Sequence, residues 1–224
     1  MPAPRPAKPA GRIRQKNEQA ILTAATAEFA RHGYKGTSMS SIAQAVGLPK
    51  ANLHYYFNNK QGLYLAVMKN ILNQWENALD SLSVDDDPAE ALSRYIHAKL
   101  EFSRSQPLAS RIFAMEVISG GQHLAAHYSQ GALDWFHGRL AVIQAWIDAG
   151  KMDPIDPAHL IFMLWGSTQH YADFSGQIAL YSGKKSLKKA DFEQAADSLV
   201  HITLKGCGLR LPGKASEAAA PTDK

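Results

Sequence analysis

A segment between Thr37 and Lys60 combines amide, imidazole, phenol and ammonium side chains that suit contact with a nucleic acid. Asn52 can form two hydrogen bonds with the edge of an adenine, His54 can donate or accept one, and Ala51 is small enough to lie beside a thymine methyl group. Hydroxyl, phenol and ammonium groups suit phosphates, which orient a protein on a duplex without reading its sequence. The side chains assigned to DNA are Thr37, Ser38, Lys50, Ala51, Asn52, His54, Tyr55, Tyr56 and Lys60.

Two short helices are expected to position these groups. The first begins at Thr37 or Ser38, because either hydroxyl can accept a hydrogen bond from a free amide in the opening turn. Gly47 can end this helix in a left-handed conformation, and Pro49 fixes the direction of the chain that follows. The second helix spans residues 50–57, and its first turn can enter the major groove, as in helix-turn-helix proteins. The buried stripe of the first helix consists of Met39, Ile42, Ala43 and Val46.

The second helix ends with Tyr55 and Tyr56, and Lys60 follows; all three are expected to hold phosphates. Adjacent residues on a helix point in different directions, so one of the two tyrosines is expected to pack inward.

The rest of the chain shows helical rather than strand periodicity, which predicts an all-α protein. A helix over residues 15–32 ends at Gly33 and supports the first three-helix domain. A longer helix over residues 61–82 carries the domain boundary. Further helices are expected over residues 89–105, 108–119, 123–149, 157–180 and 191–204, with Asp85, Asp86 and Asp87 capping the first of them.

Composition excludes several classes of protein. The chain has 224 residues, 46% of them hydrophobic, which is normal for a folded soluble protein. Its single cysteine, Cys207, cannot form an internal disulfide and is expected to be a buried small side chain. Its nine histidines show no metal-binding spacing, so neither a metal nor a cofactor is expected. No apolar run is long enough for a membrane helix or a signal peptide, and we expect a cytoplasmic protein.

The helix expected over residues 157–180 has two different faces to bury. One is mainly apolar and comprises Leu164, Ser167, Tyr171, Phe174 and Ile178. The other is mixed and comprises Phe162, Trp165, Gly166, Gln169 and Asp173. Trp165 and Gln169 lie one turn apart and could bind a small planar base, because they offer an aromatic surface beside a donor and an acceptor. A satisfied core glutamine or an interhelical hydrogen bond explains the same residues.

Three charged residues interrupt otherwise apolar helices and are further candidates for a ligand pocket. They are Lys99, Arg111 and Glu116. In the alternative interpretation Lys99 extends its ammonium to water, and Arg111 and Glu116 pair with other helices.

From Arg14 to Tyr64 the chain resembles the TetR family of bacterial transcription repressors, through ILTAATAEFARHGY, IAQAVGL and LHYYFNNKQGLY. Beyond that domain, KLEFSRSQPLASRIFAMEVISGG and DPIDPAHLIFMLWGSTQHYADF resemble the regulatory domain of family members that control pyrimidine breakdown and respond to uracil and thymine. The resemblance implies a homodimeric repressor that leaves a near-palindromic operator in double-stranded DNA when a small-molecule effector, uracil or thymine, binds. Its two reading helices would then face major grooves about 34 Å apart or a multiple of that distance.

With this resemblance the chain divides into four parts. We expect a disordered basic arm over residues 1–14, a helix-turn-helix domain over 15–62, a regulatory ligand-binding and dimerisation domain over 63–210, and a disordered tail over 211–224. The arm could follow DNA phosphates or a minor groove, or remain solvated.

Three alternatives remain open. A TetR-type regulator could respond to an unrelated small molecule. A hydrolase-like enzyme would need a nucleophile and base in a recognisable setting, which the chain lacks. A purely architectural DNA-binding protein would bind all sequences alike, with a steep dependence on salt.

Overall fold

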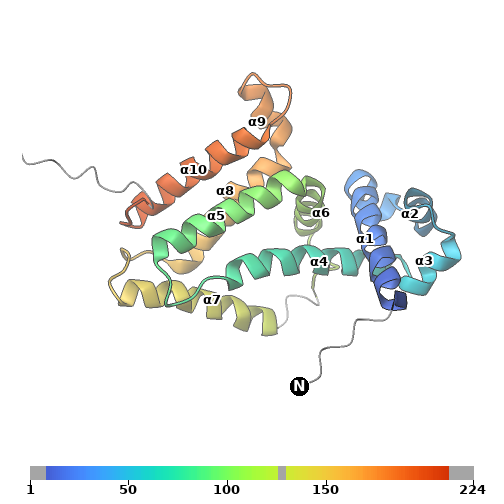
Figure 1. Cartoon of the computed structure of the whole chain (residues 1–224), viewed down its shortest axis with the longest axis horizontal. Helices are drawn as coiled ribbons and strands as arrows, with labels where there is room; N and C mark the ends of the chain where they lie inside the picture. Colours follow the sequence, from blue (N-terminus) through green and yellow to red (C-terminus); the bar gives the residue numbers. More distant parts are fainter. Residues whose placement is uncertain (1–8, 126–129, 212–224) are drawn as a thin grey trace, which may run out of the picture. The chain divides into compact units, whose positions relative to one another are not determined.

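The computed structural model describes residues 9–125 and 130–211, except for the side chains of residues 9–12 and 130, and within these residues it is helical without strands (Figure 1). This confirms the expected all-α class. The helices are α1 (Pro9–Gly36), α2 (Met39–Val46), α3 (Lys50–Tyr56), α4 (Lys60–Asp80), α5 (Pro88–Ser105), α6 (Pro107–Ile118), α7 (Gln130–Asp148), α8 (Pro157–Asp173), α9 (Ser175–Tyr181) and α10 (Lys189–Gly206).

Helix α1 is longer than the sequence analysis expected. It begins at Pro9, so residues 9–14 are helical and the prediction of a disordered arm is wrong for them. Residues 1–8 of that arm, and residues 212–224 of the expected tail, lie outside the described residues. The predicted end at Gly33 corresponds to a break within α1, where Gly33 has φ 67° and ψ 174°. Only glycine adopts such a backbone conformation without strain.

Two other helices also differ from expectation. The helix predicted over residues 123–149 starts at Gln130 among the described residues, because His123 lies in a turn that follows Gly120 and Gly121, both with positive φ. The helix predicted over residues 157–180 is two helices, α8 and α9, which meet at Phe174 with φ −116° and ψ 24°. Phe174 is neither proline nor glycine, although Gly176 follows it within α9.

The helices group into two compact units, which divide inside α4 between Gln74 and Trp75. The first unit contains α1, α2, α3, the beginning of α4 and α6; in it α1 packs against α2 and α6, and α2 packs against α3. Helix α6 therefore belongs with the amino-terminal helices, although the sequence analysis placed it in the domain of residues 63–210. The core of this unit includes Ile21, Phe29, Ile42, Leu53 and Leu63.

The second unit contains the end of α4 with α5, α7, α8, α9 and α10. Helix α5 packs against both α8 and α10, and α7 contacts α8 (Figure 1). Its core includes Leu92, Ile96, Trp146 and Leu164, and the Trp146 Nε1 donates a 3.1 Å hydrogen bond to the Ser83 carbonyl. The carboxylate of Asp87 accepts a bond from the Glu90 amide, so the acidic run caps α5 as expected. Cys207 is buried, as predicted.

Candidate nucleic-acid interface and effector site

Helices α2 and α3 form the expected pair around a tight turn. The Ser38 Oγ accepts a 3.0 Å hydrogen bond from the Ser41 amide, and the Ser41 hydroxyl accepts from the Ser38 amide in return. This reciprocal capping places the start of α2 at Met39. Gly47 ends α2 in the left-handed conformation, with φ 71°, and Pro49 immediately precedes α3. The local signals in the sequence therefore predicted both helix ends correctly.

Thr37, which was predicted to contact DNA, has a structural role in the folded chain. Its side chain is buried, and its hydroxyl makes hydrogen bonds with the carbonyls of Gly33 (2.9 Å) and Glu28 (3.1 Å). The Thr37 hydroxyl thus offers its one proton to two carbonyls of α1 near the break at Gly33. Of the two hydroxyls considered for capping, only that of Ser38 lies exposed at the start of α2.

One side of α3 is anchored and the other is open. Leu53 is fully buried, and Phe57, just after the helix, is almost fully buried. The residues that face outward are exposed: the base-contact candidates Ala51, Asn52 and His54, together with Lys50 and Tyr55. The His54 Nδ1 lies 3.1 Å from the Asn58 carbonyl, which limits how that ring can turn. The structure thus brings the predicted reading residues together on one accessible surface.

The two tyrosines at the end of α3 have different environments. Tyr56 is half-buried, and its hydroxyl accepts a 3.0 Å hydrogen bond from the Asn17 amide group of α1. Tyr55 is 70% exposed, and the Arg14 guanidinium lies 5.7 Å from its ring centroid. The inward tyrosine expected from the sequence is therefore Tyr56. Sequence reasoning did not connect Arg14 with Tyr55, because the two lie on different helices.

Lys60, which was predicted to hold a phosphate, is engaged with backbone carbonyls in this structure. Its Nζ donates to the carbonyls of Tyr34 (2.9 Å) and Thr37 (3.0 Å), and it lies 4.5 Å from the centroid of the Tyr34 ring. These contacts connect the first residue of α4 to the junction between α1 and α2. An ammonium engaged in this way would have to give up two hydrogen bonds to reach DNA.

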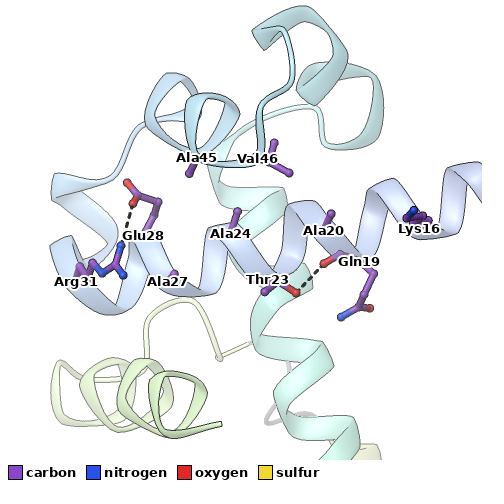
Figure 2. A pocket seen from close by; sticks show the side chains of 10 residues that line it. All are labelled: Lys16, Gln19, Ala20, Thr23, Ala24, Ala27, Glu28, Arg31, Ala45 and Val46. Atoms are coloured by element: carbon purple, nitrogen blue, oxygen red, sulfur yellow. Dashed lines mark hydrogen bonds and ion pairs between the residues drawn. The ribbon is translucent and has the colours of Figure 1, made fainter. Parts of the chain in front are cut away.

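A groove of about 750 Å³ runs along α1 beside the end of α2 (Figure 2). Its floor is formed by Ala20, Ala24 and Ala27, and Lys16 and Arg31 lie toward its two ends. Arg31 faces Glu28 at 3.9 Å, and the Thr23 hydroxyl donates to the Gln19 carbonyl. Methyl groups offer little chemistry for recognition, so the outward face of α3 remains the candidate nucleic-acid surface.

In the second unit, Trp165 is held by α5. Its Nε1 donates a 2.7 Å hydrogen bond to the Tyr95 hydroxyl, which is buried. Burial raises the pKa of Tyr95, although the bond from Trp165 opposes that rise. The Trp165 ring also contacts Phe136 and Phe162, the latter 48% exposed. The indole N–H therefore has a protein partner, and only the face of the ring is available to a ligand.

The two faces predicted for residues 157–180 are only partly correct. The residues of α8 that are buried are Leu160, Ile161, Leu164, Thr168 and Ala172. Of the face expected to be apolar and buried, Leu164 is buried but Phe174 is 52% exposed, because the helix breaks there. Gln169 and Asp173, from the mixed face, are half-buried.

Lys99 is buried rather than extended to water. It is 4% exposed, and its Nζ lies 4.1 Å from the centroid of the Trp75 ring. Burial lowers the pKa of Lys99 to about 8, and the Asp173 carboxylate acts against that change. A buried ammonium, a carboxylate and an aromatic ring are thus close together in one unit. Sequence analysis missed Trp75, which read as one more apolar position on α4.

Arg111 and Glu116 belong to the first unit, whereas Lys99 and Trp165 belong to the second. Arg111 is exposed on α6. Glu116 is buried, and its carboxylate accepts hydrogen bonds from the Tyr64 hydroxyl and the His123 amide. The alternative interpretation, that Glu116 pairs with another helix, is the one the structure supports.

Comparison with known proteins agrees with this architecture. Residues 21–67 match the family described as bacterial regulatory proteins, tetR family, and residues 68–210 match the YcdC-like protein, C-terminal region. No helix among the described residues has the length and hydropathy to cross a membrane.

Individual relatives are also transcriptional regulators. The HTH-type transcriptional regulator RutR of Escherichia coli (strain K12) is 40% identical over 189 residues, which cover 84% of this chain and 89% of that protein. The uncharacterized HTH-type transcriptional regulator YhgD of Bacillus subtilis is 26% identical over 148 residues, covering 64% of this chain and 76% of that protein. A TetR family transcription regulator from Marinobacter aquaeolei has the same fold, with a TM-score of 0.63 at 24% identity over 85% of this chain and 97% of that one. The chain is therefore a DNA-binding transcriptional regulator rather than an enzyme, and it belongs to the TetR family.

Proposed function

We propose that the protein is a homodimeric repressor whose α3 reads a near-palindromic operator and that a small planar base, uracil or thymine, releases it. The observation that carries the DNA part is the open face of α3, on which Lys50, Ala51 and Asn52 are all exposed while Leu53 is fully buried. A helix anchored in this way can enter a major groove without unfolding any of its core.

Within this surface, Asn52 is proposed to read a base and Tyr55 to hold a phosphate. An asparagine amide can donate to N7 and accept from N6 of the same adenine, and this pair of hydrogen bonds discriminates among bases. The exposed Tyr55, with Arg14 beside its ring, combines a phenol with a positive charge and suits the backbone. Ser38 lies exposed at the start of α2, where backbone amides also favour a phosphate.

Selection of bound duplexes from a random-sequence pool tests this proposal. Asn52→Ala is expected to relax preference at particular base pairs, whereas Tyr55→Ala should weaken binding to all sequences alike. Arg31→Ala is the control, because it removes a positive charge from α1 that already faces Glu28. An unchanged sequence preference in Asn52→Ala would remove Asn52 from the readers.

The dimer is proposed to form through the second unit. Side chains of α8, α9 and α10 leave large apolar areas exposed: Met163 (46%), Leu180 (73%), Tyr181 (82%) and Ile202 (62%). Exposed apolar side chains mark a protein interface where they form a contiguous patch, and we propose that these side chains do so. A second copy of the chain is the partner that a near-palindromic operator requires, because two identical readers must face two equivalent half-sites.

The effector is proposed to bind near Lys99, Asp173 and the Trp165 ring. Uracil and thymine have alternating carbonyl and N–H groups, so an ammonium can donate to a carbonyl while a carboxylate accepts from the neighbouring N–H. Gln169, half-buried on α8, offers a further donor and acceptor. The resemblance of this region to pyrimidine-responsive family members supports the same ligand class.

The size of the ligand is compatible with useful affinity. A base of about eight heavy atoms can gain at most about 1.5 kcal/mol per atom. Micromolar binding requires about 8 kcal/mol, which is within that limit. To release DNA, the ligand must also favour the non-binding state by about 1 to 3 kcal/mol per site.

Thermal shift with a panel of ligands tests the effector class. Uracil or thymine is expected to raise the melting temperature, because a ligand that prefers the native state stabilises it. The panel includes the dihydro derivatives, xanthine and a fatty acyl compound. Lys99→Met should remove the response, whereas Lys189→Met, at a lysine side chain that is 71% exposed, should keep it. A response to the acyl compound alone would assign the protein an unrelated effector.

A further inference from the structure

Glu116 is the centre of a polar cluster inside the first unit. Its Oε2 accepts a 2.9 Å hydrogen bond from the Tyr64 hydroxyl of α4, and its Oε1 accepts a 2.7 Å bond from the His123 backbone amide. The His123 Nδ1 lies 3.1 Å from Oε2. Burial acts to raise the pKa of Glu116, but these hydrogen bonds outweigh it and the pKa is lowered. The carboxylate is therefore held charged by groups from two other segments of the chain.

Aromatic rings extend the cluster to α1. The Tyr34 ring lies 5.0 Å from the Tyr64 ring and 4.3 Å from the His123 ring, measured between centroids. Tyr34 follows the break at Gly33, where α1 changes direction toward α2. The cluster thus borders the backbone that leads into the helix-turn-helix.

The same junction is held from two further sides. Lys60 donates to the carbonyls of Tyr34 and Thr37, and the Thr37 hydroxyl bonds to the Gly33 carbonyl. Met115 Cε lies 3.8 Å from where a Cβ on Gly33 would be. The residue after Thr37 is Ser38, the cap of α2. A continuous set of contacts therefore runs from Glu116 on α6 to the first residue of the DNA-reading helix pair.

We propose that Glu116 is a positioning residue for DNA binding: by holding Tyr64 and His123 against Tyr34, its carboxylate sets the α1–α2 junction and hence the orientation of α3. This rests on the proposed role of α3 as the reading helix. A charged, fully hydrogen-bonded group specifies geometry more narrowly than an apolar contact does, because each bond is lost with a small displacement. Movement of α6 by a fraction of an ångström would then change affinity for DNA.

A double-mutant cycle on operator binding tests the proposal. Glu116→Gln keeps the shape of the side chain but removes its charge. Tyr64→Phe removes the hydroxyl that donates a hydrogen bond to the Glu116 carboxylate. Each change is expected to lower affinity for DNA at least tenfold. The double variant should be little worse than either single one, because both remove the same interaction. Ile118→Gln, a change at an 84% exposed position of the same helix, is the control and should bind like the wild type.

Two further measurements separate positioning from a general loss of stability. Hydrogen exchange of the backbone amides of residues 38–42 is expected to become faster in Glu116→Gln, while amides of α10 stay protected. The fraction of folded protein at the assay temperature should remain close to one by circular dichroism. The proposal would be overturned if Glu116→Gln lost affinity for DNA only in proportion to its unfolded fraction. It would also be overturned if the effects of Glu116→Gln and Tyr64→Phe on affinity were strictly additive.

These experiments distinguish failure of the positioning role of Glu116 from failure of the proposed role of α3 in reading DNA. If Asn52→Ala alters sequence preference and Glu116→Gln leaves affinity unchanged, α3 reads DNA and only the positioning role of Glu116 fails. If Asn52→Ala has no effect while Glu116→Gln still weakens binding, the junction matters but the reading surface lies elsewhere.

Discussion

The ammonium of Lys99 lies 4.1 Å from the centroid of the Trp75 ring, inside a unit whose core is mostly apolar. A cation over an indole ring gains favourable electrostatic energy, but part of that gain offsets the loss of water around the charge. The pair therefore adds little to the stability of the folded protein, which is consistent with the proposed role of Lys99 in binding the effector.

Replacement of Lys99 by methionine is expected to stabilise the folded protein at pH 7. The native pKa of about 8 lies below the ordinary value of 10.5, so the unfolded state binds more protons between these two pH values. The native state bears the cost of a buried charge fully below pH 8, and that cost disappears as the pH rises toward 10.5. The gain in Lys99→Met, on the order of 1 to 3 kcal/mol at pH 7, should shrink over this window in urea unfolding experiments. A gain independent of pH would mean that the charge is not the cause.

The hydrogen bond between Trp165 and Tyr95 is expected to stabilise the contact between α5 and α8. Tyr95→Phe leaves the indole N–H without its acceptor and should cost about 1 to 3 kcal/mol of unfolding free energy. Trp165→Phe should lower the unfolding free energy less in the Tyr95→Phe background than in the wild type, because it removes the indole N–H that Tyr95→Phe leaves without an acceptor. Urea denaturation of the four proteins measures this coupling. Trp135→Phe is the control, since its indole bonds to Asp80 at the surface, and its effect should be smaller than that of Tyr95→Phe.

Lys60 is expected to support DNA binding indirectly. Lys60→Met should lower affinity by loosening the junction at Tyr34 and Thr37. The slope of log affinity against log salt should remain that of the wild type, because no phosphate contact is lost. Loss of a direct phosphate contact would instead reduce the magnitude of the slope by about 0.9. Fluorescence anisotropy with a selected operator at several salt concentrations measures both quantities. A reduced slope would show that Lys60 leaves its two carbonyl partners and contacts a phosphate in the complex.

A charge on α10 is expected to separate the subunits. Ile202 is 62% exposed, so Ile202→Lys should leave the fold of each chain intact while placing an ammonium in the proposed interface. Sedimentation velocity should show a shift toward monomer and a matching loss of operator affinity. Val84→Lys, at an exposed loop position (47%), should sediment like the wild type. Wild-type protein that sediments as a monomer at all concentrations would contradict the proposed dimer.

Local sequence was sufficient for the helix-turn-helix. The Ser38 cap, the left-handed Gly47 and the buried Leu53 beside exposed neighbours depend on residues only a few positions away, so short patterns predict them. The same holds for the helical content of the chain and for the cap on α5. The break at Phe174 escaped prediction because Phe174 itself is neither proline nor glycine, the residues that ordinarily mark a helix end in a sequence, and because Gly176 lies inside the next helix.

Only the tertiary structure decided what the charged side chains do. Lys60 bonds to carbonyls more than twenty residues earlier, and Glu116 accepts from Tyr64 at a separation of 52 residues. Periodicity places such residues on a helix but does not identify the side chains opposite them. A lysine on an apolar face could reach water or be enclosed, and for Lys99 the packing of α5 beside Trp75 enclosed it. Helix positions follow from neighbours along the chain, whereas the environment of a buried charge follows from residues that folding brings together.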